Sequence, residues 1–357
     1  MTTVLITGFP VDAARRLAQE LVQGGDRVLL LTRGSFTKDA ETFAASLAKA
    51  TTSGEARPDR GGVLEIVEGD ILQLDLGLPG AKVRQYHMEI EEIHHIAAIS
   101  YLGIAPERMR SVNVEGLREL LEMALGCKKL RRLCLWSTAF VAGARSGTVH
   151  EDELLVGQHF RNAYEETKAE AEVLARSAMA KLPITVVRPA ILVGDSQTGE
   201  VRRLDGPYLL INAIVHAPQR TPIPLPGRGG YPLHVVPVDY AVRAALHLAR
   251  HPDAVGGTYH LVDDQPLTAR QLFDAVADAA GKPRPNVFLP SSLARAVLSL
   301  PGLAGRVRSE RSFVEWFDTD VRFDDRKARA LLDPSGIRCP PVPSYVDALV
   351  RHVRERA

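Results

Sequence analysis

Residues 3–18 read TVLITGFPVDAARRLA, and this stretch decides how the N-terminal half folds. It opens with a run of apolar and β-branched residues, which predicts a buried strand at 4–7. Gly8 comes next, and from Asp12 onward Ala, Arg and Leu recur with the period of a helix. The stretch therefore predicts a strand, a tight turn at Gly8 and a helix over 12–23.

The same alternation continues to residue 190. Further strands are predicted at 27–31, 64–68, 93–97, 132–136 and 184–188, and further helices at 38–51, 106–125 and 163–181. Alternating strands and helices predict an α/β fold, here a Rossmann-type doubly wound parallel sheet. In such a sheet ligands bind at the carboxyl ends of the strands, near the switch in strand order.

After residue 190 the chain becomes richer in proline and glycine, as in HAPQRTPIPLPGRGGYP. We therefore divide it into a nucleotide-binding domain, 1–190, and a smaller C-terminal substrate-binding lobe, 191–357. Strands predicted near 233–238 and 258–262 are candidates for a return to the main sheet. The apolar segment 290–317 is expected to form the core of the lobe or a lid over an apolar substrate.

Bulk composition excludes several classes of protein. The chain has 357 residues with a formal net charge of +1, which gives no reason to expect nucleic acid or an anionic membrane as a partner. Its three cysteines are too few and too irregularly spaced for a disulfide framework or a zinc site, and no metal site is predicted. There is neither a membrane-spanning run nor a signal peptide, so we expect a cytoplasmic protein.

The pattern that carries chemistry follows the strand at 132–136. Ser137 and Thr138 stand at its end, and NAYEETKAEAE places Tyr164 and Lys168 four residues apart, on one face of a helix. A tyrosine acts more readily as a proton donor at neutral pH when its pKa is lowered, and a nearby ammonium favours the phenolate. A hydroxyl at 138 or 137 would orient the substrate oxygen.

These motifs resemble the extended short-chain dehydrogenase/reductases, and most of all the thioester-reductase and fatty-acyl-reductase-like (male-sterility-like) group. The resemblance is carried by TGFPVDAA, VEGDI, IHHIAA, NVEGLRELL, STAFVAG, YEETK and VVRPA, and it covers roughly residues 1–265. It implies that Tyr164 is the general acid, that Lys168 lowers its pKa and binds the nicotinamide ribose, and that Thr138 is the catalytic hydroxyl. The positions implied to bind the cofactor are Gly8, Phe9, Pro10, Val11, Arg33, Asp70, Ile71, Ala97, Ala98, Lys168, Pro189 and Ala190.

Two local features bear on that cofactor. A dinucleotide-binding loop usually has three glycines, and here their positions hold Gly8, Val11 and Ala14. Asp12 would repel phosphate, although Arg15 and Arg16 lie one turn further on. The strand at 27–31 is followed by Thr32 and Arg33 rather than an acid, which favours the 2′-phosphate of NADP(H).

The sequence thus predicts an NADPH-dependent reductase of a carbonyl on a hydrophobic substrate: an acyl thioester on CoA or a separate carrier, an aldehyde or a ketone. Two alternatives remain open, a nucleotide-sugar epimerase or dehydratase and a non-catalytic dinucleotide sensor. The resemblance further implies a homodimer. His94 and His95 are adjacent on a strand and should face opposite ways, so they are not expected to bind one metal ion together.

Overall fold

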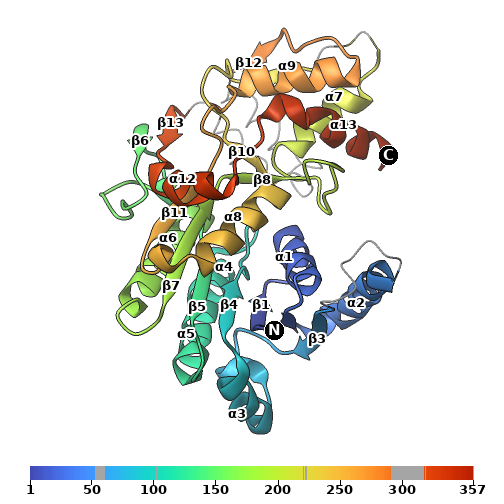
Figure 1. Ribbon diagram of the computed structural model, residues 1–357. Helices are drawn as coiled ribbons and strands as arrows, with labels where there is room; N and C mark the ends of the chain where they lie inside the picture. The colour runs from blue at the N-terminus through green and yellow to red at the C-terminus, as the bar shows by residue number, and fades with distance from the viewer. Residues whose placement is uncertain are drawn as a thin grey trace.

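A seven-stranded parallel sheet forms the centre of the protein in the computed structural model (Figure 1), which describes residues 1–52, 61–101, 103–219, 221, 223–290, 317 and 319–356. The strand order is β11-β7-β5-β4-β1-β2-β3. The strands are β1 (Thr3–Thr7), β2 (Arg27–Thr32), β3 (Val63–Glu68), β4 (Glu92–His95), β5 (Arg132–Trp136), β7 (Ile184–Pro189) and β11 (Thr258–Leu261). The predicted Rossmann-type doubly wound fold is confirmed.

Helices cover both faces of this sheet. Buried residues of α1 (Asp12–Gln23), α2 (Thr37–Thr52) and α8 (Val238–Arg250) share one core cluster with the sheet. Those of α3 (Gly80–Glu89), α5 (Gly116–Gly126) and α6 (Ala163–Ala178) form the cluster on the opposite face. Because parallel strands covered on both faces are buried on both sides, every residue of β1 (TVLIT) and β7 (ITVVRP) is buried, including the polar ones.

The predicted helix over 106–125 is interrupted. It consists of α4 (Pro106–Arg110), a π-helical turn (Ser111–Glu115) and α5. Within the turn, the Asn113 side chain bonds both backbone groups of Ile99 (2.7 and 3.1 Å) and the Thr167 hydroxyl (3.0 Å). The widened turn therefore ties the loop after β4 to α6.

Residues after 190 contribute to the main sheet as well as to a separate lobe. Strand β11 pairs with β7, and α8 packs along α1, as Figure 1 shows. The predicted strand near 233–238 is β10 (Val235–Pro237), which pairs with β8 (Ile191–Val193) rather than with the main sheet. The division into domains at residue 190 stays a prediction.

The lobe itself is built from α7 (Tyr208–His216), α9 (Ala269–Ala280) and α13 (Val346–Glu355), which share a third core cluster. Short parallel pairs join β9 (Leu225–Pro226) to β12 (Phe288–Leu289) and β6 (Gly147–Val149) to β13 (Val321–Phe323), and α12 (Arg326–Leu332) follows β13. Of the apolar segment 290–317, residues 291–316 lie outside the described part. Phe317 is buried and stacks on Phe273 with ring centroids 5.8 Å apart.

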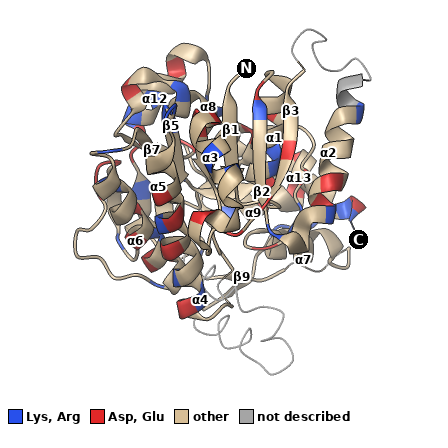
Figure 2. Ribbon diagram, turned by 90° about the horizontal axis from the view of Figure 1, so that it is seen from below, with Lys and Arg blue, Asp and Glu red and all other residues tan. Residues whose placement is uncertain are grey.

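The charged residues are interspersed rather than gathered by sign, as Figure 2 shows for the basic and acidic positions along the helices. Within the described residues, no helix combines the length and apolarity needed to cross a membrane.

Candidate functional site

A cavity of about 760 Å³ opens at the carboxyl ends of the central strands. Its wall is formed by the segments that follow β1, β2, β3, β4, β5 and β7, together with residues 201–208 of the C-terminal part. This is the edge at which a doubly wound sheet binds its ligands. All the predicted site residues line it: Gly8, Phe9, Pro10, Val11, Arg33, Asp70, Ile71, Ala97, Ala98, Thr138, Tyr164, Lys168, Pro189 and Ala190.

The turn after β1 requires glycine at position 8. Gly8 has a φ of +101°, and a Cβ atom there would lie 2.7 Å from the backbone nitrogen of Ala97. The chain turns through a hydrogen bond from the Val11 N–H to the Gly8 carbonyl (3.1 Å), and Val11 then caps α1 without a side-chain hydrogen bond. Ala14, at the third glycine position, is completely buried between helix and sheet. The loop thus packs closely against the backbone of Ala97. It leaves the first N–H groups of α1 available to a phosphate.

The Asp12 carboxylate accepts a hydrogen bond that was not predicted from the sequence. Its Oδ2 accepts a hydrogen bond from the backbone N–H of Arg202 at 3.1 Å. The two arginines expected to offset its charge are occupied elsewhere: Arg16 pairs with Asp195 at 2.8 Å, and Arg15 pairs with Asp39 at 3.5 Å. No local signal could have revealed this contact, because 190 residues separate the two partners.

At the second strand, the Arg33 guanidinium lies 5.1 Å above the ring of Phe36. In the described part of the chain it has no ion-pair partner, and it lines the cavity. Asp70 lines the cavity while its Oδ1 accepts the N–H of Leu72 at 3.0 Å, so it also holds the turn after β3.

The residues predicted to be catalytic lie together at the ends of β5 and α6. Asn162 caps α6 by accepting the N–H of Glu165 at 3.0 Å, which starts the helix just before Tyr164. The Thr138 hydroxyl hydrogen-bonds to the Tyr164 phenol. One turn along α6, Lys168 Nζ donates to the carbonyl of Trp136 at 2.6 Å.

The electrostatics differ from the sequence prediction in one respect. Burial raises the pKa of the Tyr164 phenol to about 12, and the hydrogen bond from Thr138 opposes this only in part. The predicted lowering of this pKa is therefore wrong for the structure, because removing the phenol from water disfavours its anion. Burial also lowers the pKa of Lys168 to about 8, against the opposing pull of Glu172. At neutral pH Tyr164 keeps its proton and Lys168 its charge.

The two hydroxyls after β5 have different partners. Ser137 Oγ donates to Glu172 Oε2 at 2.8 Å, which leaves the hydrogen bond to Tyr164 to Thr138. Glu172 forms an ion pair with Arg188 at 2.7 Å, and both side chains are fully buried. Burial raises the pKa of Glu172, but Arg188, Arg176 and the Ser137 hydroxyl together outweigh it, and the net shift is downward.

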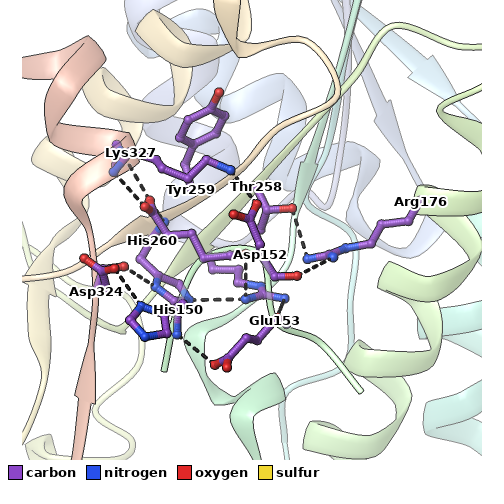
Figure 3. Close-up of polar contacts among 12 residues, drawn as sticks. His150, Asp152, Glu153, Arg176, Thr258, Tyr259, His260, Asp324 and Lys327 are labelled. Atoms are coloured by element: carbon purple, nitrogen blue, oxygen red, sulfur yellow. Dashed lines mark hydrogen bonds and ion pairs between the residues drawn. The ribbon is translucent and has the colours of Figure 1, made fainter. Parts of the chain in front are cut away.

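This buried pair continues into a polar network that joins the C-terminal residues to the sheet edge (Figure 3). Arg188 donates to His260 Nε2 at 3.3 Å, and His260 donates through Nδ1 to the carbonyl of Asp324 at 2.7 Å. The Asp324 carboxylate in turn contacts His150 at 2.8 Å. The Glu151 carboxylate accepts the N–H groups of His260, Lys327 and Ala328 at 2.7–3.0 Å. The network holds the end of β5, helix α6 and strand β7 in fixed relative positions.

The histidines of β4 face different neighbours, as expected from a strand. His94 contacts Glu92 at 2.7 Å, whereas His95 contacts the Thr7 hydroxyl at 2.9 Å beneath the phosphate loop. Burial, with Lys168 nearby, lowers the pKa of His95 to about 3, so this ring is neutral. Among the described residues there is no group of three His, Cys, Asp or Glu side chains that could hold a metal ion.

Fold and site together define the class: a dinucleotide-binding protein of the extended short-chain dehydrogenase/reductase type. More narrowly, the chain belongs to the male sterility protein family, whose model matches residues 7–245.

Individual relatives agree with this assignment. The chain is 30% identical over 223 residues to the carboxylic acid reductase of Segniliparus rugosus, a match that covers 56% of this chain but 18% of that protein. The terminal R domain from the myxalamid PKS-NRPS biosynthetic pathway superposes with a TM-score of 0.79 at 25% identity, over 100% of this chain and 91% of that one. The UDP-glucuronic acid 4-epimerase of Bacillus cereus, solved in complex with NAD, shares the fold, with a TM-score of 0.72 at 18% identity over 99% of each chain.

Proposed function

We propose that the protein is an NADPH-dependent reductase that acts on a carbonyl of a hydrophobic substrate, with Tyr164 as the proton donor. One observation carries the proposal. Thr138, Tyr164 and Lys168 meet in the wall of the same cavity that the Gly8 turn enters. The relationship to a carboxylic acid reductase supports a reductive rather than an epimerising reaction.

The residues at hand fit the cofactor. Gly8 leaves room where any side chain would strike the backbone of Ala97, and the start of α1 presents free N–H groups. Asp70 and Ile71 would lie beside the adenine, and Pro189 and Ala190 beside the nicotinamide. Arg33, with no acid at the end of β2, supports NADP(H) over NAD(H).

The reduced nicotinamide supplies the hydride when bound, and the protein supplies the proton. The Thr138 hydroxyl orients the carbonyl oxygen of the substrate, and Tyr164 donates its phenolic proton to that oxygen as negative charge develops there. With a pKa near 12, Tyr164 is fully protonated before the reaction. The buried ammonium of Lys168 adds positive charge on the same side, which favours the phenolate that forms.

The substrate class rests on the cavity wall and the relatives. Beyond the catalytic residues the wall is mainly apolar, with Phe140, Ile191, Leu192 and Val193. An acyl chain would bury its methylene groups there. The acyl group would arrive as a thioester on CoA or on a separate carrier, or as an aldehyde or ketone.

The test is Tyr164→Phe, assayed with NADPH and a series of acyl-CoA, aldehyde and ketone substrates of increasing chain length. Turnover should fall by about 10²- to 10⁴-fold, the usual contribution of general acid catalysis, while the Kd of NADPH changes less than about twofold. Thr138→Ala should also reduce kcat, whereas Ser137→Ala is the matched control that keeps the hydroxyl facing Tyr164. Turnover that survives in Tyr164→Phe would refute the role of this residue. Purification with one equivalent of tightly bound NAD would instead favour an epimerase.

A further inference from the structure

The segment between β8 and α7, residues 194–207, crosses the start of α1, and we call it the strap. It is fastened to the nucleotide-binding half by Asp195, which pairs with Arg16, and by Arg202, whose backbone N–H bonds Asp12. On its other side His352 bonds the backbone of Val201. The strap, with Arg202 in it, is therefore held from both sides.

The Arg202 side chain points toward the end of β2. Its Nη2 lies 3.0 Å from Oδ2 of Asp39, in the first turn of α2, six residues after Arg33. Arg33 and Arg202 both line the cavity. The residues that follow the second strand of a dinucleotide-binding sheet meet the adenosine ribose and its 2′ substituent. The guanidinium of Arg202 therefore lies at the start of α2, on the side of the cavity where the adenosine ribose would bind.

The charges at this corner leave Arg202 able to bind an anion. Asp39 is shared, because Arg15 also pairs with it at 3.5 Å. Within the described residues the Nε and Nη1 groups of Arg202 have no hydrogen-bond partner. The other acids nearby are Asp12, whose carboxylate interacts with the charge of Arg202, Glu200, and Glu68, which accepts the hydroxyl of Thr37 at 3.4 Å. Guanidinium groups bind phosphate through paired N–H donors, so two of them can surround one phosphate.

We propose that Arg202 binds the 2′-phosphate of NADP(H) together with Arg33, so that the strap contributes to cofactor selectivity. This rests on the cofactor named in the proposed function. It also explains how the altered loop tolerates Asp12, since that carboxylate serves as the anchor that positions Arg202.

The experiment measures Kd by calorimetric titration of the full-length protein with NADPH, NADH, 2′,5′-ADP and 5′-AMP. Arg202→Gln removes the charge but keeps the backbone N–H that bonds Asp12. It should weaken NADPH and 2′,5′-ADP by about 10- to 100-fold, the range for hydrogen bonds to a charged group, and change NADH and 5′-AMP less than about threefold. Arg203→Gln, which loses the same charge from the next position, should leave the NADPH:NADH ratio within about twofold. Asp39→Asn should tighten 2′,5′-ADP, because it releases both Arg15 and Arg202.

The results separate this inference from the proposed function. Wild-type protein that binds NADPH no better than NADH overturns both. A wild-type preference that Arg202→Gln retains overturns the role of Arg202 alone. Equal weakening of NADPH and NADH also overturns it, because the strap then acts on the pyrophosphate or on the fold. If Arg202→Gln does not fold, Arg202→Lys keeps the charge without the paired donors and should still lower the NADPH:NADH ratio.

Discussion

Removing Glu172 should destabilise the protein far more than removing an acid from the surface of the same helix. Five hydrogen bonds reach its carboxylate: one from Ser137, two from Arg188 and two from Arg176, at 2.7–3.1 Å. In Glu172→Ala the guanidinium of Arg188, fully buried, would retain neutral acceptors only: the carbonyls of Glu151 and Glu153 and the ring of His260. Leaving one charge of a buried pair without its partner costs about 3–5 kcal/mol.

That loss is a large part of the free energy of unfolding of a typical protein, about 5–15 kcal/mol. Glu170→Ala is the matched control, because Glu170 lies two residues earlier on α6 and pairs with Arg110 at 2.9 Å with both side chains exposed. An exposed pair contributes about 0–1 kcal/mol. Urea denaturation followed by circular dichroism gives both values from the shift of the midpoint.

A second variant isolates the charge from the loss of packing. Glu172→Leu combined with Arg188→Met removes both ions and should recover most of the stability that Glu172→Ala loses, because apolar side chains of similar size replace buried ion pairs at little cost. The reasoning is refuted if Glu172→Ala loses less than about 1 kcal/mol more than Glu170→Ala, within the range of a surface pair.

Two further predictions concern the phosphate loop and the polar network. Gly8 has a φ of +101°, and a Cβ atom there would lie 2.7 Å from the backbone nitrogen of Ala97, so Gly8→Ala should lose about 2 kcal/mol or more of stability and most of the NADPH affinity. A Cβ at Gly230 would meet nothing within 4 Å, so Gly230→Ala should change neither quantity. Burial raises the pKa of Glu151 from 4.5 to about 7, so its stabilising contribution is complete below pH 4.5 and is lost as the pH rises through 7. The stability of wild type relative to Glu151→Gln should fall by about 3 kcal/mol between pH 4 and pH 8 in urea titrations, and a flat difference would contradict this.

Much of the fold was predictable because burial on both faces makes parallel strands apolar and their spacing regular. Helix α3 escaped prediction for a physical reason: it buries only Val83 and Tyr86, so GAKVRQYHME shows little helical pattern. The return of β11 to the main sheet was a candidate from the sequence, whereas the packing of α8 on α1 was hidden, since more than 200 residues separate the two helices.

The residues of the candidate site also differ in how far their roles could be predicted from local sequence. Tyr164 and Lys168 were predictable because their contact depends on local helical spacing, and Thr138 because it follows directly from a strand. Burial is a property of the assembled chain, so the direction of the Tyr164 pKa shift could not be inferred from neighbours in sequence. Arg202 was beyond reach for the same reason, as its contacts with Asp12 and Asp39 span more than 160 residues.

The position of β11 at the edge of the sheet has a consequence for how the protein is made. During translation, β1 to β7 leave the ribosome before residue 258. Until residue 250 has emerged α1 lacks the cover of α8, and until residue 258 has emerged β7 has an unpaired edge. An exposed strand edge and an uncovered apolar helix face are each prone to associate with other chains. The nascent protein is therefore expected to depend on chaperones until about residue 261 has emerged, and versions shortened before β11 are expected to aggregate rather than fold.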